Sequence, residues 1–230
     1  MRLARRSQPF DHPDWLYEIK FDGFRALAYV EAGKCRLVSR RRHEYKSFRE
    51  LCVSIPNHLR GNEAVLDGEI VWLDQYGRSQ FKELMFRRAQ PFFNAFDLLF
   101  LNGEDLRSLP LLRRKARLRK LIGRQKSRLL YLDHLEQKGS GLYAKACEFD
   151  LEGIVAKWKD GSYIADDRRS SWVKIKNPNY SQIEGREELF ERQLATLHPQ
   201  RPYQSLLLSF SRAPSTSRLR TSTSFAAALG

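Results

Sequence analysis

Charged and apolar residues alternate near the start of this 230-residue sequence. Glu18, Lys20 and Asp22 occupy every second position. Ile19 and Phe21 lie between them. Because successive side chains of a β-strand point to opposite faces, this spacing predicts a half-buried strand with one charged face. A lysine between two acids is most often part of a surface ion-pair ladder, so the segment indicates chemistry only in combination with others.

Two carboxylates stand in a second, mostly apolar segment, which we predict to be a strand over residues 65–73. Asp67 and Glu69 are two positions apart and therefore lie on the same face of that strand. An unpaired carboxylate is costly to bury in a central strand. The pair therefore indicates a bound cation or another polar ligand.

Lysines end two further segments that we predict to be strands, at 153–158 and 171–176. Glu152 precedes the first of these strands, and Lys157 lies near its end. Lys174 and Lys176 project from the same face of the second. Like charges side by side on a strand repel each other, and an anionic ligand between the two lysines would remove that repulsion.

The elements that position these residues are predicted to be mainly β-strands. Besides the strands above, candidates lie at 15–30, 35–38, 92–101 and 129–132.

The clearest predicted helix starts at Pro110, a residue that suits the first turn. Its apolar residues, Leu111, Leu118, Leu121 and Ile122, recur at helical spacing. The rest of its surface, over residues 110–128, is strongly basic, because the sequence has no acidic residue between positions 105 and 133. This basic run is either a solvated helix face or a phosphate-facing surface, and the sequence leaves both interpretations open.

The composition favours a polyanionic partner, because the formal net charge is +14. No apolar run approaches the roughly 20 residues that span a bilayer, and the N-terminal residues lack an apolar signal core. We therefore expect a cytoplasmic protein without a membrane partner. Cys35, Cys52 and Cys147 form no CxxC pair, and the histidines show no paired spacing, so any metal should be oxygen-ligated.

Six short motifs, taken in order, resemble the nucleotidyltransferase motifs of ATP-dependent DNA ligases. They lie at 20–25, 39–40, 67–69, 95–99, 152–157 and 172–176. The resemblance covers about residues 8–190, and it is most similar to the ligase domain of bacterial double-strand-break repair enzymes. It implies an α+β fold in which two antiparallel β-sheets are flanked by helices, with the nucleotide pocket between the sheets.

The resemblance also implies covalent chemistry at Lys20. Its amine would attack the α-phosphate of ATP, expel pyrophosphate and hold AMP as a phosphoramidate. The AMP would then pass to a DNA 5′-phosphate, from which a 3′-hydroxyl would displace it. An amine must be neutral to attack, and neighbouring cations such as Lys174, Lys176 and a metal ion favour that form.

Further roles follow from the same resemblance on the side of the nucleoside. Glu18 would meet the adenine amino group and Phe96 would stack on the base, although an ordinary core position is an equal alternative for Phe96. Arg25 and Arg40 would contact the ribose or the DNA phosphate. Ile19 is expected among the residues that bind the nucleotide.

On the phosphate side, Glu69 would lie by the ribose and, with Glu152, would hold Mg²⁺. Lys174 and Lys176 would hold the α-phosphate and stabilise charge developing on it. The role of Lys157 stays open.

The expected organisation is an adenylyltransferase catalytic domain over 1–182, a helical linker over 183–204 and a disordered tail over 205–230. We expect the OB-fold domain of complete ligases to be absent, which would reduce activity. The expected partners are nicked or broken duplex DNA and either a repair protein or a separate OB-fold. The alternatives are an RNA ligase or capping-type nucleotidyltransferase, and a non-catalytic basic DNA-binding remnant of a ligase.

Overall fold

The computed structural model describes residues 1–61, 63–86, 90–123, 127–164 and 170–183. These residues belong almost entirely to one compact unit, Met1–Ser181. The linker predicted over 183–204 and the tail predicted over 205–230 lie outside the described residues, apart from Ile183. In the described part of the chain, no helix is long and apolar enough to cross a membrane.

One of the two β-sheets, called sheet A here, combines strands from both ends of the unit. Its strands, in spatial order, are β1 (Ala4–Arg5), β11 (Trp172–Lys176), β10 (Gly153–Trp158), β2 (Trp15–Ile19) and β9 (Leu135–Glu136). Neighbouring strands are antiparallel, except that β1 runs parallel to β11. The strand predicted around Lys20 is β2, which ends at Ile19, directly before that lysine, and pairs with β10.

The other sheet, sheet B, is built from the middle of the sequence. Its strands, in spatial order, are β4 (Lys34–Ser39), β3 (Phe24–Glu31), β5 (Glu63–Val71), β6 (Phe92–Leu101) and β7 (Glu104–Asp105), with β8 (Leu129–Tyr131) paired to β6. All these pairs are antiparallel except β6 with β8. Strand β5 begins and ends two residues earlier than predicted, but it still carries Asp67 and Glu69.

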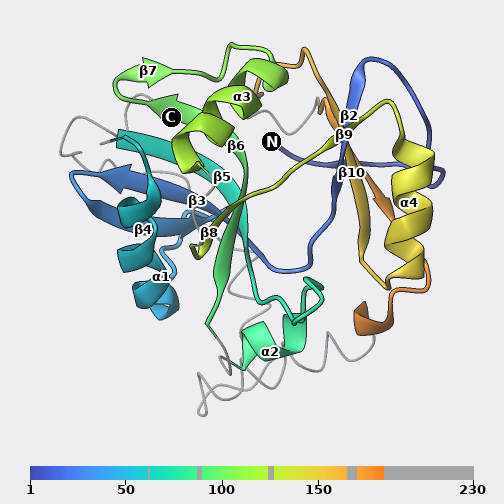
Figure 1. The fold of residues 1–230 in the computed structure, drawn as a ribbon, viewed down its shortest axis with the longest axis horizontal. Coiled ribbons are helices and arrows are strands. Elements are labelled where there is room, and N and C mark those ends of the chain that lie inside the picture. Colours follow the sequence, from blue (N-terminus) through green and yellow to red (C-terminus); the bar gives the residue numbers. More distant parts are fainter. Residues whose placement is uncertain (62, 87–89, 124–126, 165–169, 184–230) are drawn as a thin grey trace, which may run out of the picture. The chain divides into compact units, whose positions relative to one another are not determined.

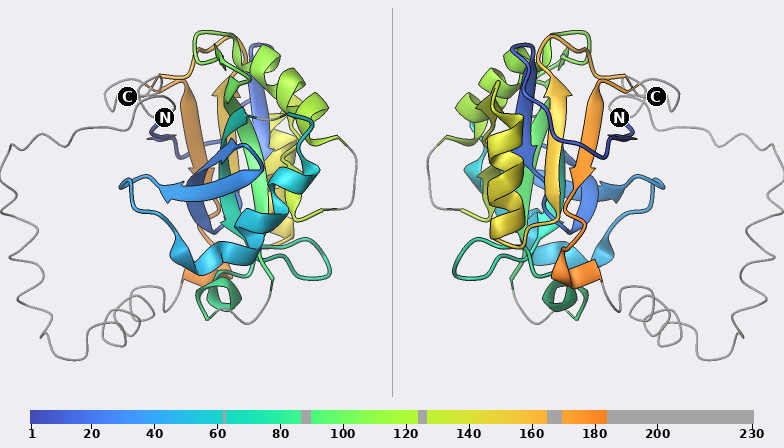
Figure 2. Two further views of the ribbon diagram at one scale, coloured as in Figure 1. Left: turned by 90° about the vertical axis from the view of Figure 1, so that its left-hand side faces the viewer. Right: turned by 90° about the vertical axis from the view of Figure 1, so that its right-hand side faces the viewer.

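Helices cover the outer faces of the two sheets, as Figures 1 and 2 show. The α-helices are α1 (Arg49–Ser54), α2 (Phe81–Met85), α3 (Leu111–Ile122) and α4 (Gly139–Glu148), and short 3-10 turns lie at Lys46–Phe48, Pro56–His58 and Ser181–Ile183. Helix α3 packs on β6 and β8, whereas α4 packs on β2 and β10. The predicted fold class, α+β with two sheets flanked by helices, is confirmed.

The alternation of side chains on β10 explains how the sheets meet. Ile154 and Ala156 pack in a cluster beneath α4. Val155 points the other way, into a smaller apolar cluster that also contains Phe96 of β6 and Trp172 of β11. The inner faces of the two sheets therefore share one apolar layer, and the candidate site lies beside it.

Two cations of the basic helix lie neither on a solvated face nor on a phosphate-facing surface. Arg114 and Lys115 are buried, with exposed fractions of 0% and 1%. Arg114 makes a two-pronged ion pair with Asp97 of β6, and Lys115 pairs with Glu18 of β2. For these two residues, neither a solvated face nor a phosphate-facing surface is correct, because acids from other strands neutralise them.

Candidate active site

A pocket opens on the inner faces of the two sheets. The residues that line it are Leu3, Glu18, Ile19, Lys20, Phe21, Arg25, Glu69, Asn94, Phe96, Leu132, Val155, Lys157 and Trp172. Six of the thirteen are among the site residues predicted from the sequence. The structure therefore brings together residues from strands that are far apart in the sequence.

Lys20, directly after β2, is the centre of the polar part of this site. Its amine nitrogen lies 2.5 Å from Oε2 of Glu152, the residue that precedes β10. The other oxygen of Glu152 lies 3.0 Å from Nζ of Lys176 on β11. Burial raises the pKa of Glu152, but Lys20 and Lys176 outweigh burial and hold that pKa below its usual value. Glu152 is thus an ionised carboxylate between two cations.

Lys174 lies two residues before Lys176 on β11, so the two side chains point to the same face of the strand. The pKa of Lys174 is lowered by burial first, and then by the positive charges of Lys176 and Lys20. The positive charges of these lysines repel one another. An anionic ligand bound among them would relieve that repulsion. The repulsion that the sequence predicted between the two lysines of β11 is therefore present in the folded chain.

Glu69 of β5 faces the same group from sheet B. Its pKa is raised to about 8, mainly by burial, while Glu152 and Asp67 add to the increase and Lys20 and Arg25 oppose it. Two carboxylates that disfavour each other's charge suit a divalent cation. No set of three His, Cys, Asp or Glu side chains poised for a metal occurs in the described ranges. The donors present therefore fit Mg²⁺ only as two carboxylates completed by phosphate oxygens of a ligand.

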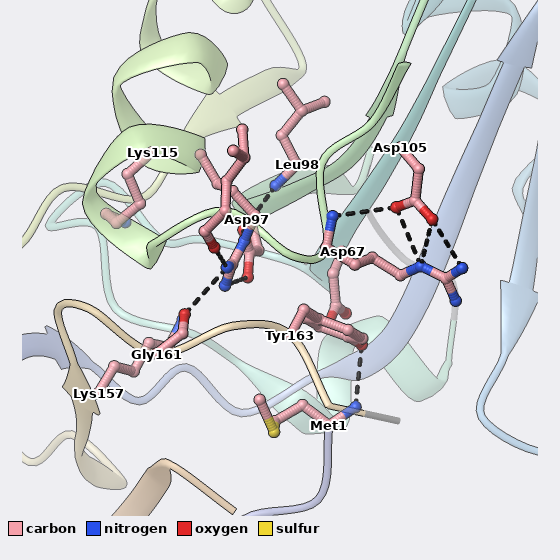
Figure 3. Close-up of polar contacts among 12 residues, drawn as sticks. Met1, Asp67, Asp97, Leu98, Asp105, Lys115, Lys157, Gly161 and Tyr163 are labelled. Atoms are coloured by element: carbon pink, nitrogen blue, oxygen red, sulfur yellow. Dashed lines mark hydrogen bonds and ion pairs between the residues drawn. The ribbon is translucent and has the colours of Figure 1, made fainter. Parts of the chain in front are cut away.

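Arg25 of β3 is held by Asp67, its neighbour on β5. Nε and Nη2 of Arg25 donate to the two carboxylate oxygens at 3.1 and 2.6 Å. The hydroxyl of Tyr163 donates to the same carboxylate at 2.9 Å. The ammonium of Met1 donates to that hydroxyl at 3.0 Å (Figure 3). The sequence predicted a bound cation or another polar ligand for this pair of carboxylates, but the partner of Asp67 is the guanidinium of Arg25.

Glu18 of β2 is almost completely buried, and each of its oxygens faces a lysine. Nζ of Lys115 lies 2.5 Å from Oε1, and Nζ of Lys157 lies 2.6 Å from Oε2. The amine of Lys157 also lies 3.9 Å from the ring centre of Trp172 and 4.2 Å from that of Phe96. Burial lowers the pKa of Lys157 to about 8, although Glu18 acts in the opposite direction.

Not every predicted residue joins the pocket. Arg40 is exposed in the turn after β4 and does not line it. Glu152 and Lys176 adjoin it through Lys20, as their ion pairs show. Phe96 lines the pocket, but its ring also packs edge-on against Trp172, so both roles weighed for it are compatible with its position.

The sequence interpretation missed Lys115. A signal was available, because Lys115 is four residues after Leu111 and three before Leu118, which places it within the apolar stripe of the helix. A charged residue in such a stripe indicates a buried partner. The surrounding run of surface cations obscured this exception.

Comparison with known proteins identifies the class. The family model of the ATP dependent DNA ligase domain matches residues 4–176. The chain therefore belongs to the ATP-dependent DNA ligase family, and its fold is the nucleotidyltransferase fold of those ligases.

Among individual relatives, the chain is similar to the multifunctional non-homologous end joining protein LigD of Pseudomonas aeruginosa. The two are 35% identical over 172 residues, which are 71% of this chain and 20% of that protein. The bifunctional non-homologous end joining protein LigD of Bacillus subtilis is 32% identical over 209 residues, 77% of this chain and 34% of that protein. The chain thus spans about a fifth to a third of the length of these relatives.

A solved structure of the ligase domain from Mycobacterium tuberculosis LigD shares this fold. The TM-score is 0.63 and the sequence identity 30%, over 76% of this chain and 58% of that chain. A mycobacterial DNA ligase D complexed with ATP and MES has a TM-score of 0.62 and 29% identity, over 76% of this chain and 60% of that chain.

Proposed function

We propose that residues 1–182 form the adenylyltransferase domain of a DNA ligase, with Lys20 as the nucleophile. The observation that carries the proposal is the amine of Lys20 at the pocket wall, 2.5 Å from the buried Glu152. Lys176 shares that carboxylate. Membership of an ATP-dependent family and the ATP complex of a mycobacterial relative support ATP as the substrate.

In the proposed reaction, the nitrogen of Lys20 forms a bond to the α-phosphorus of ATP while the bond to pyrophosphate breaks. The amine must first lose a proton, and Glu152, its hydrogen-bond partner, or water can accept it. Lys174 and Lys176 then face the phosphate and stabilise the charge that develops on it. Glu69 and Glu152 would hold Mg²⁺, which supplies positive charge to the phosphate oxygens when it is bound.

The remaining pocket residues bind the nucleoside in this proposal. Glu18 accepts a hydrogen bond from the adenine amino group, Phe96 contacts the base, and Ile19 contributes to the wall. Arg25 faces the ribose. Arg40 is exposed on the surface, and it is assigned to the DNA phosphate.

The AMP is next transferred to the 5′-phosphate of nicked or broken duplex DNA, and a 3′-hydroxyl then displaces it. Two observations support DNA as the substrate. Relatives of this chain are named non-homologous end joining proteins, and the net charge of the chain is +14. Because the relatives are much longer than this chain, sealing can also involve a repair-protein partner or a separate OB-fold.

Incubation with α-labelled ATP and Mg²⁺, followed by denaturing electrophoresis, tests the covalent step. Label should remain on the protein and be released by acid, as expected of a phosphoramidate. Lys20→Ala should abolish labelling. Lys34→Ala, which replaces the exposed first residue of β4, should not. Persistent labelling of the Lys20→Ala variant would contradict the assignment of Lys20 as the nucleophile. Preferred uptake of label from GTP would favour a capping-type enzyme instead.

The metal assignment has its own test. Glu69→Ala and Glu152→Ala should each lower labelling strongly at limiting Mg²⁺ without unfolding the chain. Wild-type rates in either variant would remove that residue from the site.

A further inference from the structure

Lys115 lies behind the pocket wall and contacts three residues from two other parts of the unit. It comes from α3 and is only 1% exposed. Its amine lies 2.5 Å from Oε1 of Glu18 and donates to the carbonyl of Leu132 at 3.0 Å. The ring centre of Tyr131 lies 4.9 Å from the same nitrogen. Lys115 does not line the pocket itself, whereas Glu18 and Leu132 do.

This arrangement fixes what Glu18 can offer to a ligand. A carboxylate has about four acceptor positions. Lys115 occupies one of them on Oε1 by a hydrogen bond, and Lys157 forms an ion pair with Oε2. Burial alone raises the pKa of Glu18, but Lys115 and Lys157 outweigh burial and keep the pKa below its usual value. The remaining acceptor positions therefore belong to an ionised group, which can accept hydrogen bonds but cannot donate one.

We propose that Lys115 is a positioning residue for base selection: it holds the Glu18 carboxylate in the orientation that accepts an exocyclic amino group of the base. A 6-aminopurine then satisfies the carboxylate. A base with hydrogen or a carbonyl oxygen at that position leaves the remaining acceptor positions of Glu18 unfilled and forms no hydrogen bond with the carboxylate, so it binds less well. The inference rests on the proposed function, in which Glu18 faces the adenine.

Lys115 could in principle serve only to pack α3 against the sheets. The packing role and the positioning role predict different ratios of the labelling rates with two nucleotides. Loss of packing lowers labelling with every nucleotide to the same extent, whereas loss of positioning lowers it selectively for nucleotides that carry the amino group. The test therefore compares ATP with purine riboside triphosphate, which lacks only that group.

The variants are Lys115→Met, which removes the charge at similar length, and Lys115→Arg, which keeps it. Lys120→Met is the matched control, because Lys120 is exposed on the same helix. For each full-length variant, the initial rate of covalent labelling is measured with the two α-labelled nucleotides. Lys115→Met should reduce the preference for ATP about tenfold, since a hydrogen bond to a charged group contributes about that much. Lys115→Arg should restore part of the preference, and Lys120→Met should match the wild type.

An unchanged preference in a folded Lys115→Met variant overturns the proposal, whatever its absolute rate. Circular dichroism establishes that each variant folds. Where Lys115→Met does not fold, Lys115→Gln takes its place, because it retains a donor for the Leu132 carbonyl. If the wild type takes up no label at all, the proposed function fails. The base preference is then measured as the difference in thermal stabilisation by the two nucleotides, which Lys115→Met should abolish.

Discussion

Replacing Arg114 by methionine should destabilise the domain severely, because it leaves a buried carboxylate without its partner. Arg114 and Asp97 are both 0% exposed. Nε and Nη2 of Arg114 donate to the two oxygens of Asp97 at 2.8 and 2.9 Å. Nη1 donates to the carbonyls of Leu109 and Gly161 at 2.5 and 3.0 Å. Removing one partner of a buried ion pair costs about 3–5 kcal/mol, and the two carbonyls also lose their donor.

We therefore expect the free energy of unfolding to fall by about 3–5 kcal/mol, a large part of the 5–15 kcal/mol typical of a domain. Urea unfolding followed by tryptophan fluorescence measures it. Arg113→Met is the control, because Arg113 is the exposed neighbour on the same helix turn, and it should cost less than about 0.5 kcal/mol.

The combined variant Asp97→Leu, Arg114→Met separates the cost of the orphaned charge from the loss of packing. With no charge left to bury, it should recover a substantial part of the stability. A loss below about 1 kcal/mol in Arg114→Met, or a combined loss equal to the sum of the single ones, would refute this reasoning.

Four further outcomes are expected. The pKa of Lys157 is lowered to about 8, so the unfolded chain binds more protons above that pH, and stability should rise with pH between 8 and 10.5. Relative to Lys157→Met, the wild type should gain about 3 kcal/mol across this window in urea unfolding; a constant difference would contradict the shift. Gly153 has a φ of +134°, and an added Cβ would lie 2.1 Å from the carbonyl oxygen of Ile175. Gly153→Ala should therefore cost about 2–4 kcal/mol and lower the melting temperature, unlike Gly141→Ala, whose Cβ meets nothing within 4 Å. DNA binding should weaken with salt at a logarithmic slope of about −0.9 per neutralised phosphate, and salt-independent binding would exclude an electrostatic interface. A nick that already carries a 5′-adenylate should be sealed faster than an ordinary nick with ATP, because it bypasses adenylation, and equal rates would show that adenylation is not limiting.

The sequence predicts the strands of the site well, because their signals are local. The alternation around Lys20 and the carboxylate pair of β5 depend on a period of two within a few residues. The helix after Pro110 is equally visible from its apolar spacing. Its structure begins at Leu111, as a proline in the first turn would suggest.

Side-chain partners are less accessible to sequence reasoning. The acid that neutralises Lys115 is 97 positions away, and the one that neutralises Arg114 is 17 positions away. Helix and strand periodicity contain no information on which strand a helix face meets, so the basic run was interpreted as surface. The exposure of Arg40 depends likewise on how the β4 turn leaves the sheet rather than on its motif.

The pairing order of sheet A determines when this sheet can form during synthesis of the chain. Strand β1 hydrogen-bonds to β11, and Lys20 meets a glutamate that is 132 residues later in the chain. Such distant contacts have a high entropic cost and form slowly. Sheet B, whose strands are near neighbours in sequence, can assemble while the ribosome is still adding residues. Lys20, the proposed nucleophile, therefore lacks its hydrogen-bond partner until Glu152 has been made, and a nascent chain that stops earlier carries the lysine without its site.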